Sequence, residues 1–415
     1  MNCRHCGAEL SLPFLDLGSA PPSNAYLTVD TLREPEQWFP LRVLVCEQCR
    51  LVQTEDFSRP ETLFAADYAY FSSFSDTWLE HACLYVQSMI KRFSLGAGSK
   101  VVEIASNDGY LLQYVHQAGI PCLGIEPTAG TARAARDKGL EIIEDFFGAQ
   151  LAQKLVDEGH AADLMTANNV LAHVPNINDF VRGFAILLKP QGAATFEFPH
   201  LLKLVQENQF DTIYHEHYSY LSLTTVQTIF TSQGLRIFDV ERLPTHGGSL
   251  RVYAQRADLG KHQCSERVTN LLAEEKMAGM AGTDFYSGLQ KKAEQIKNDL
   301  LLFLIDARRQ GLSVAAYGAA AKGNTLLNFA GVRADLLQYV VDRNPAKQGK
   351  FMPGSRISIV DEAHLQQHRP DRVLILPWNL CDEIMLQLHY IREWGGQFVT
   401  AVPNLKIHQD KHKNI

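Results

Sequence analysis

Residues 211–220, Asp-Thr-Ile-Tyr-His-Glu-His-Tyr-Ser-Tyr, concentrate side chains that can move protons. Within ten residues they supply two imidazoles, two carboxylates and three phenols. Buried polar groups need partners, so this composition is atypical of an apolar core, and three tyrosines are atypical of a solvated loop. Histidine, glutamate and tyrosine are the usual general acids and bases. The segment is therefore either a wet catalytic pocket or a hydrogen-bonded structural cluster.

Length and composition limit the kinds of protein to consider. A chain of 415 residues predicts two or three domains, and its 46% hydrophobic and 20% charged residues are typical of globular proteins. A net charge of −7 leaves no basic excess for nucleic-acid phosphates. The sequence contains no apolar run long enough for a bilayer and no signal-peptide core. We expect a cytoplasmic protein with no nucleic-acid or membrane partner.

Two Cys-x2-Cys pairs, Cys3 with Cys6 and Cys46 with Cys49, mark the N-terminal region. Four thiolates form the tetrahedral sulfur set that zinc prefers, and nearby prolines favour turns. A redox role fits poorly, because neither pair opens a helix after a strand. The spacing predicts a structural Zn²⁺ ion in a zinc-binding module of residues 1–70, without an open coordination position for chemistry.

Strand-like and helix-like stretches alternate in residues 71–270. We expect strands near residues 100–105, 122–126, 140–147, 163–169, 192–199, 236–241 and 249–255. This alternation predicts an α/β fold, a doubly wound and mostly parallel sheet. Such sheets bind ligands beyond the carboxyl ends of their strands, where Glu126, Asn168 and Glu197 fall.

The first loop of this sheet argues against a dinucleotide. A nicotinamide site needs several glycines so that backbone amides can approach a pyrophosphate. Residues 105–109, Ala-Ser-Asn-Asp-Gly, contain one glycine and an added carboxylate. Negative charge is favourable beside the ammonium and sulfonium of S-adenosylmethionine (SAM), and Glu126 is placed to accept hydrogen bonds from both ribose hydroxyls. We therefore expect SAM.

Several long motifs follow one another along the chain. They are residues 103–109 (EIASNDG), 168–173 (NNVLAH), 210–217 (FDTIYHEH), 245–251 (THGGSLR), 317–325 (YGAAAKGNT) and 347–354 (KQGKFMPG). With the paired cysteines, they resemble the three-domain SAM-dependent sugar C-methyltransferases, which act on nucleotide-linked 4-keto-6-deoxysugars. The resemblance covers nearly the whole chain and implies a central class I, Rossmann-like methyltransferase domain and a C-terminal Rossmann-like α/β domain. One departure is Ala105, where many methyltransferases carry glycine.

The resemblance also implies roles for individual residues. The catalytic set is His217 as the base, with Glu216, Tyr214, Tyr68 and His173 near it. The SAM-binding set is Glu103, Ala105, Ser106, Asn107, Gly109, Tyr110, Glu126, Pro127, Asp145, Phe146, Asn168 and Asn169. The set expected to bind the nucleotide sugar is Tyr70, Ser72, His246, Arg251, Lys322 and Asn324.

Residues 271–415 contain a second α/β unit. A helical stretch is expected over residues 276–309, then a strand at 312–317, a turn at 318–325 and a helix from about Leu326. Glycines at a strand–helix turn expose backbone amides that bind anions, and Lys322 adds a cation. The turn serves close packing alone, or it holds the diphosphate of the substrate, as the resemblance implies. Its spacing is not that of an ATP-hydrolysing loop.

The implied reaction needs a base, because a carbon next to a ketone becomes a nucleophile only after losing a proton. It also needs a partner for the enolate oxygen and a sulfonium methyl aligned with the carbon. A neutral imidazole suits the base near pH 7, which favours His217. Glu216 is secondary, because adjacent residues on an extended strand point to opposite faces. We expect a monomer that methylates C3 of a dTDP-linked 4-keto-6-deoxysugar in branched-deoxysugar biosynthesis.

Other readings of the sequence stay open. Methylation at C5, or of a GDP-linked sugar, fits the same residues. A nicotinamide-dependent sugar-nucleotide oxidoreductase could use the C-terminal unit. A binding protein that keeps a cofactor-shaped domain without chemistry is the third alternative.

Overall fold

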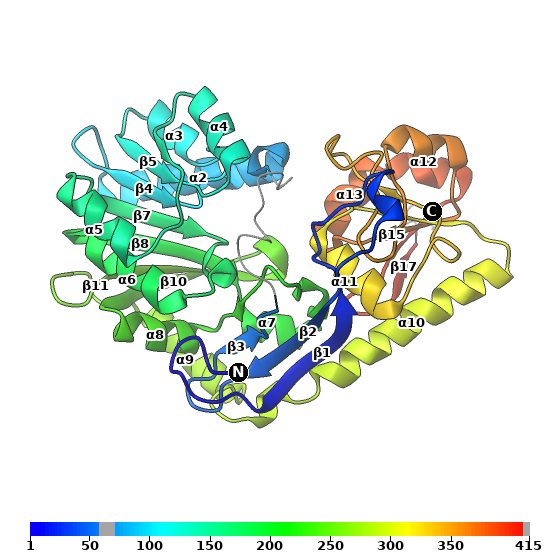
Figure 1. The fold of residues 1–415 in the computed structure, drawn as a ribbon, viewed down its shortest axis with the longest axis horizontal. Helices are drawn as coiled ribbons and strands as arrows, with labels where there is room; N and C mark the ends of the chain where they lie inside the picture. Colours follow the sequence, from blue (N-terminus) through cyan, green and yellow to red (C-terminus); the bar gives the residue numbers. More distant parts are fainter. Residues whose placement is uncertain (58–70, 410–415) are drawn as a thin grey trace, which may run out of the picture.

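The computed structural model describes residues 1–57 and 71–409, and within these ranges the chain forms three β-sheets (Figure 1). The central and C-terminal sheets lie on opposite sides of the molecule, and the N-terminal strands lie below and between them (Figure 1). The long helix α10 (Leu289–Arg309) runs beneath the C-terminal domain (Figure 1). Residues from all three parts can therefore meet near the middle of the molecule.

The N-terminal sheet is antiparallel and has the order β1-β2-β3-β9. Its strands are β1 (Leu12–Ala20), β2 (Phe39–Val45), β3 (Val52–Thr54) and β9 (Ser219–Tyr220). Strand β9 comes from residues expected in the central domain, and it pairs with β3 through Val52 opposite Tyr220 and Gln53 opposite Ser219. The segment carrying His217 is thus attached directly to the N-terminal module.

The central sheet has the order β10-β11-β8-β7-β4-β5-β6. Its strands are β4 (Val101–Ile104), β5 (Cys122–Ile125), β6 (Ile142–Ile143), β7 (Ala162–Asn168), β8 (Leu188–Pro199), β10 (Leu235–Leu243) and β11 (Ser249–Arg256). Strands β4 to β8 are parallel, whereas β11 runs antiparallel to both of its neighbours. Buried apolar side chains pack on both faces of this sheet, which is why its strands read as nearly continuous hydrophobic runs.

Helices cover the central sheet. They are α2 (Asp76–Phe93), α3 (Leu112–Gln117), α4 (Ala129–Asp137), α5 (Ala149–Asp157), α6 (Ile177–Leu187), α8 (Leu223–Ser232) and α9 (Glu266–Met277). Helix α7 (Leu201–Gln206) packs its buried leucines instead in the core shared by the N-terminal strands and the C-terminal domain. Helix α2 begins at the cap residue Ser75, whose side chain accepts the backbone N–H of Trp78, and it ends at Ser94 in a left-handed conformation.

The C-terminal sheet has the order β14-β13-β12-β15-β16-β17, and only β17 is antiparallel to its neighbour. Its strands are β12 (Val314–Tyr317), β13 (Val340–Val341), β14 (Ile359–Val360), β15 (Arg372–Ile375), β16 (Gln397–Thr400) and β17 (Lys406–His408). Its other helices are α11 (Ala321–Ala330), α12 (Glu362–His368) and α13 (Cys381–Gln387).

The predicted α/β fold class is confirmed, with an N-terminal cysteine module and two mostly parallel sheets. The domain boundaries at residues 70 and 270 stay predictions. The prediction of one continuous helix over residues 276–309 is wrong, because residues 278–288 separate α9 from α10. Gly279 and Gly288 adopt φ of 89° and 95° there, a left-handed backbone that glycine accepts without a steric penalty. No helix in the described part of the chain is both long and apolar enough to cross a membrane.

Candidate active site and metal centre

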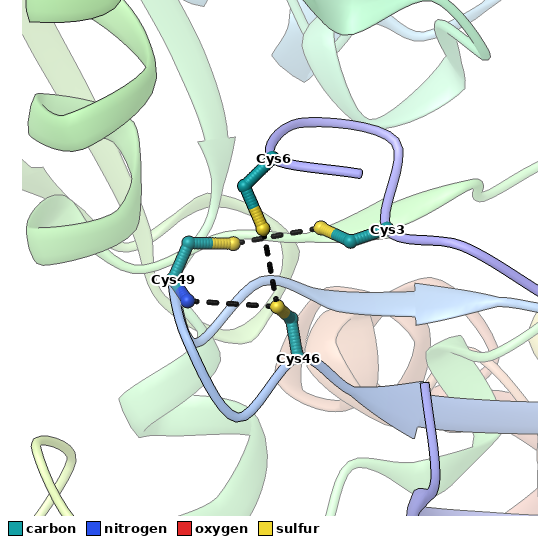
Figure 2. Close-up of side chains that lie close together, drawn as sticks. All are labelled: Cys3, Cys6, Cys46 and Cys49. Carbon is teal, nitrogen blue, oxygen red and sulfur yellow. Dashed lines mark hydrogen bonds between the residues drawn. The ribbon is translucent and has the colours of Figure 1, made fainter. Parts of the chain in front are cut away.

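The four expected metal ligands come together in the N-terminal module (Figure 2). Cys3 and Cys6 lie on one loop, Cys46 and Cys49 lie on the loop after β2, and all four side chains point toward one another (Figure 2). The Sγ atoms of Cys3 and Cys49 are 3.5 Å apart, as are those of Cys6 and Cys46. All four lie within 4.8 Å of one another. Zinc–sulfur bonds of about 2.3 Å require sulfur separations of this size, so the donor set fits a tetrahedral Zn²⁺ ion.

Both cysteine loops have the same backbone geometry. The N–H of Gly7 donates to the carbonyl of Cys3 at 3.0 Å, and the N–H of Arg50 donates to that of Cys46 at 2.9 Å. Gly7 and Arg50 have φ of 76° and 62°. A left-handed residue directly after the second cysteine closes each turn and directs two thiols to one point.

A cavity of about 440 Å³ lies at the carboxyl ends of the parallel strands of the central sheet. Nine of the expected SAM-binding residues line it: Ala105, Asn107, Tyr110, Glu126, Pro127, Asp145, Phe146, Asn168 and Asn169. Ser72, His173 and His246, which were expected in other roles, also line it. Its volume is within the usual range for pockets that hold a ligand of the size of SAM.

Glu126 follows β5 and is almost fully buried in the wall of this cavity. Its Oε2 accepts the backbone N–H of Asn107, and its Oε1 accepts that of Thr128, both at 2.9 Å. Burial raises the pKa of the Glu126 carboxyl, and the two backbone hydrogen bonds oppose that change. Each oxygen keeps a lone pair for a further donor, so the carboxylate is held in place and can still accept from a ligand hydroxyl.

Four non-glycine residues around the cavity have left-handed backbones. Ala105, Asn107, Asn169 and His246 have φ of 54°, 50°, 56° and 57°, a conformation that costs most residues about 1–2 kcal/mol. The Oδ1 of Asn169 is buried and has no hydrogen-bond partner within the described ranges. An unpaired buried acceptor in the cavity wall fits a ligand that brings a donor, such as the ammonium of SAM.

Three expected SAM-binding residues do not line the cavity. Glu103 is buried inside the sheet, where burial raises the pKa of its carboxyl well above the usual value. Ser106 faces β5, since a Cβ at Gly124 would lie 2.4 Å from its Oγ. At Gly109 (φ 76°) a Cβ would lie 2.3 Å from Leu140. These three residues support the loop from the side away from the cavity, and none of them lines the cavity.

The first loop does not bring the expected negative charge to the cavity. The Asp108 carboxylate lies 3.5 Å from the ammonium of Lys138 and is outside the cavity lining. Its charge is therefore compensated locally. Glu126 is the buried carboxylate that reaches the cavity.

The segment around His217 forms a turn after the 3-10 helix η4 (Phe210–Thr212). The Nδ1–H of His217 donates to the carbonyl of Thr212 at 2.9 Å, so Nε2 carries the basic lone pair. The ring lies 4.0 Å from the Tyr214 ring and 4.6 Å from the His173 ring, measured between centroids. His173 lines the cavity, so its ring lies between the cavity and His217.

Burial favours the neutral form of both imidazoles. Burial lowers the pKa of His217 well below its usual value, and the charges of neighbouring groups, His173 among them, add to that. Burial lowers the pKa of His173 to about 4, and its Nδ1 donates to the carbonyl of Glu216 at 2.7 Å. The pair can accept protons, and neither ring carries a positive charge that would repel a sulfonium.

Glu216 points away from His217, as expected, although the reason differs. The segment is a turn and not an extended strand. The Glu216 Oε1 accepts from the Asn24 side chain at 3.1 Å, in the N-terminal module, and burial raises the pKa of the carboxyl. The neighbouring His215 donates to the carbonyls of Phe39 and Pro40. Both residues attach the turn to the first module.

The two C-terminal residues expected to bind the substrate, Lys322 and Asn324, lie in a helix and not in the expected turn. Helix α11 begins at Ala321 and not near Leu326. Lys322 therefore lies in its first turn, with Nζ 2.9 Å from Asn379 Oδ1 and 4.5 Å from the centre of the Trp378 ring. Burial lowers the pKa of Lys322 to about 8, which Asp211 opposes. Asn324 is fully buried and its amide donates to the Ser23 carbonyl at 2.6 Å. That contact joins two modules, so we no longer assign Asn324 to the substrate.

Arg251 also has protein partners in place of a ligand. Its guanidinium lies 2.6 Å from Glu197 and 3.3 Å from Glu241, and the nearby His81 donates to Glu197 at 2.8 Å. These contacts fix the end of β8, and Arg251 is outside the cavity lining. Tyr68 and Tyr70 lie outside the described residues. Ser72 contacts the cofactor loop, where its N–H donates to Asn107 Oδ1 at 2.9 Å.

Sequence reasoning missed several residues around the site. Trp78 lines the cavity, with ring centroids 5.9 Å from Tyr110 and 5.3 Å from His246. Trp378 donates its indole N–H to Asp211 at 2.7 Å. A tryptophan at the start of a helix after an aromatic cluster was a signal for Trp78. No local pattern marked Trp378, whose partner lies 167 residues away.

Three family models together match most of the chain. They are described as "Putative zinc binding domain" over residues 3–64, "Methyltransferase domain" over residues 78–240 and "C-methyltransferase C-terminal domain" over residues 244–403. The first match contains all four cysteines of the metal centre, and the second contains most of the residues that line the cavity.

Individual proteins are similar to all or part of this chain. The chain is 34% identical to the C-methyltransferase NovU of Streptomyces niveus over 405 residues, 98% of this chain and 96% of that protein. It is 29% identical to a ubiquinone biosynthesis O-methyltransferase of Bordetella avium (strain 197N), over 24% of this chain and 42% of that protein. A magnesium protoporphyrin IX methyltransferase of Synechocystis PCC 6803, solved with bound SAH, covers 43% of this chain and 83% of its own, at 17% identity and a TM-score of 0.35.

Proposed function

This chain belongs to the family of SAM-dependent C-methyltransferases, and from that membership we propose that it methylates the carbon beside the ketone of a nucleotide-linked 4-keto-6-deoxysugar. The observation that carries the proposal is the position of His217, whose oriented imidazole lies one ring from a cavity suited to SAM. A neutral base beside a methyl-donor pocket is what methylation next to a ketone requires.

We propose that the cavity of the central sheet holds SAM. Glu126 would accept from the ribose hydroxyls, Asn169 Oδ1 would accept from the ammonium, and Asp145 with Phe146 would meet the adenine at the rim. SAM supplies the methyl group as an electrophilic sulfonium. The neutral state of His173 and His246, whose pKa values burial lowers to about 4, keeps positive charge away from it.

The base in this proposal is His217, with Nε2 as the acceptor. The hydrogen bond from Nδ1 to Thr212 fixes the ring orientation and the tautomer before substrate binds. Removal of the proton at C3 produces an enolate, and the C3 carbon then takes the methyl group. Tyr214 and His173 flank the imidazole and exclude water from its neighbourhood.

The C-terminal domain places a positive charge, the ammonium of Lys322, near this base. Its ammonium contributes to the lowered pKa of both His217 and His246. Among the described residues it has no carboxylate within ion-pair distance. An anionic group of the substrate, the diphosphate or the forming enolate, would offset this charge. We therefore keep Lys322 as a substrate-binding residue, with Ser72 and His246.

The finer assignments are also proposals. We take dTDP as the nucleotide, C3 as the methylated position and the monomer as the working form. We propose the cytoplasm as the location, because a site of four reduced thiolates survives best in a reducing compartment. The Zn²⁺ site holds the module and has no part in the chemistry.

The test is a substrate panel. The purified enzyme is incubated with SAM and with dTDP- and GDP-linked 4-keto-6-deoxysugars, and products are followed by mass spectrometry for the gain of one methyl group. NMR of the product then distinguishes C3 from C5. Methylation of a dTDP sugar at C3 supports the proposal in full. Absence of methyl transfer to every 4-keto sugar, with activity on a phenol or amine, would overturn it.

A further inference from the structure

The loop that carries the proposed base is held from three directions. From the N-terminal sheet, the Thr54 hydroxyl donates to the His217 carbonyl at 3.0 Å. From the central domain, the Ala172 carbonyl accepts the backbone N–H of Tyr218 at 2.8 Å. From the C-terminal domain, the Thr325 hydroxyl donates to the Ile213 carbonyl at 2.7 Å. The proposed function uses none of these contacts.

The C-terminal domain makes a second side-chain contact at Asp211, just before this loop. Trp378, in the 3-10 helix η7 (Trp378–Leu380), donates its indole N–H to Asp211 Oδ2 at 2.7 Å. Asp211 is fully buried, and its Oδ1 has no partner within the described ranges. A buried carboxylate with a single directional donor depends strongly on that donor.

The Trp378 indole is itself fixed on two sides. A Cβ at Gly247 would lie 2.5 Å from the ring, so glycine at that position lets the ring pack against the backbone of η5 (Thr245–Gly247). The Lys322 ammonium lies 4.5 Å from the centre of the same ring. The indole therefore has little freedom to turn away from Asp211.

Asp211 transmits this constraint to the base over a short path. The next residue, Thr212, accepts the Nδ1–H of His217 on its carbonyl oxygen. Its hydroxyl donates to the Gln209 carbonyl at 2.7 Å, which closes the turn of η4. A shift of Asp211 therefore moves the acceptor that sets the His217 tautomer and ring direction.

We propose that Trp378 and Asp211 are positioning residues, through which the C-terminal domain holds the Thr212 carbonyl and so orients the imidazole of His217. This inference rests on the proposed function for the role of His217. The C-terminal domain then contributes to the proton-transfer geometry as well as to binding.

The first test compares two tryptophan variants. Trp378→Phe keeps an aromatic ring beside Gly247 and Lys322 and removes the N–H donor. Trp394→Phe is the matched control, since its indole N–H donates to the Pro370 carbonyl at 3.1 Å, elsewhere in the same domain. With a dTDP-linked 4-keto-6-deoxysugar, Trp378→Phe should lower kcat by about 10- to 100-fold, as expected for a misplaced catalytic group. KM and the Kd for SAM should stay within about threefold, and the control should match the wild type.

The second test addresses Asp211. Asp211→Asn keeps an oxygen acceptor for the indole and should retain most of the turnover, whereas Asp211→Ala should lose about as much as Trp378→Phe. The double variant Trp378→Phe/Asp211→Ala should be no worse than Asp211→Ala, because both changes break one contact. Additive losses would show that the two residues act separately and would overturn the inference, as would unchanged kcat in Trp378→Phe.

A measurement without substrate separates this inference from the proposed function. In protein labelled with ¹⁵N-histidine, the Nδ1–H resonance of His217, assigned with His217→Asn, should shift or broaden in Trp378→Phe and stay unchanged in Trp394→Phe. An unshifted resonance contradicts the inference even if the enzyme methylates sugars. A shifted resonance supports it even if the sugar panel fails.

Discussion

The metal centre and the active site are assembled in opposite ways. The four cysteines come from two short loops whose turns repeat one geometry, so each loop almost completes its half of the site alone. The active site draws on the ends of β4, β5 and β7, on the turn carrying His217 and on η5 and η7. A local site can be recognised from spacing, whereas a distributed site depends on how the modules pack.

The two regions are nevertheless connected. Strand β3 begins shortly after Cys49 and pairs with β9, and Thr54 at its end holds the carbonyl of His217. We therefore expect damage to the metal centre to disturb the base loop through β3.

Loss of the metal should have the largest effect on the protein. Cys46 is fully buried in the four-thiol cluster, and binding of a structural zinc is worth about 10–16 kcal/mol in peptide hosts. We expect Cys46→Ala to lose the ion and to lower the free energy of unfolding by at least about 5 kcal/mol. Elemental analysis and thermal unfolding measure both effects.

The matched control is Cys83→Ala, which removes a half-buried thiol of α2 far from the cluster. It should keep the metal and nearly the full stability of the parent. A Cys46→Ala variant as stable as Cys83→Ala, or freshly purified protein without zinc, would contradict a structural metal centre at the four cysteines.

A change at the cofactor cavity should affect binding and leave the fold intact. Glu126→Ala removes a carboxylate that holds two backbone amides and faces the cavity. It should weaken SAM binding by about 1–3 kcal/mol, the range for a lost charged hydrogen bond. Calorimetry measures the affinity, with Glu144→Ala as the control, since that exposed carboxylate pairs with Arg136. Equal affinities in the two variants would move the cofactor away from this cavity.

The smallest effect is expected at Ala105, whose φ of 54° favours glycine. Ala105→Gly relieves a left-handed conformation worth about 1–2 kcal/mol and adds about 0.5–1 kcal/mol of backbone entropy cost. The net change should be a stabilisation of about 0.5 kcal/mol, seen in chemical unfolding. Ala132→Gly inside α4 is the control and should destabilise by about 1 kcal/mol. The same sign in both variants would show that the loop is not strained.

Much of the fold followed from the sequence, because its signals are local. Cysteine spacing and alternating apolar runs predicted the metal centre and the α/β class, both of which the structure confirms. The break after Met277 was missed, since glycines at 279 and 288 were outweighed by helix-forming neighbours. The start of α11 at Ala321 was missed for the opposite reason, since the glycines at 318 and 323 led us to expect a turn there. This error changed the surroundings expected for Lys322 and Asn324.

The site was less predictable, because its contacts cross module boundaries. The resemblance supplied residue types, but only packing showed that Arg251 is paired with Glu197 and that Asn324 is bonded to Ser23. Likewise, Asp108 is paired with Lys138, which spacing did not reveal. The contact between Trp378 and Asp211 joins two domains, and no periodicity or motif encodes it.

The most direct test of this account follows one proton. Wild type, His217→Asn and the control His389→Asn, an exposed residue of the C-terminal domain, are incubated with a dTDP-linked 4-keto-6-deoxysugar in D2O without SAM. NMR follows exchange of the proton on the carbon beside the ketone. We expect exchange in wild type and in the control, and an exchange rate about 10²–10⁴-fold lower in His217→Asn, with unchanged SAM binding. Equal exchange rates in all three proteins would contradict His217 as the base.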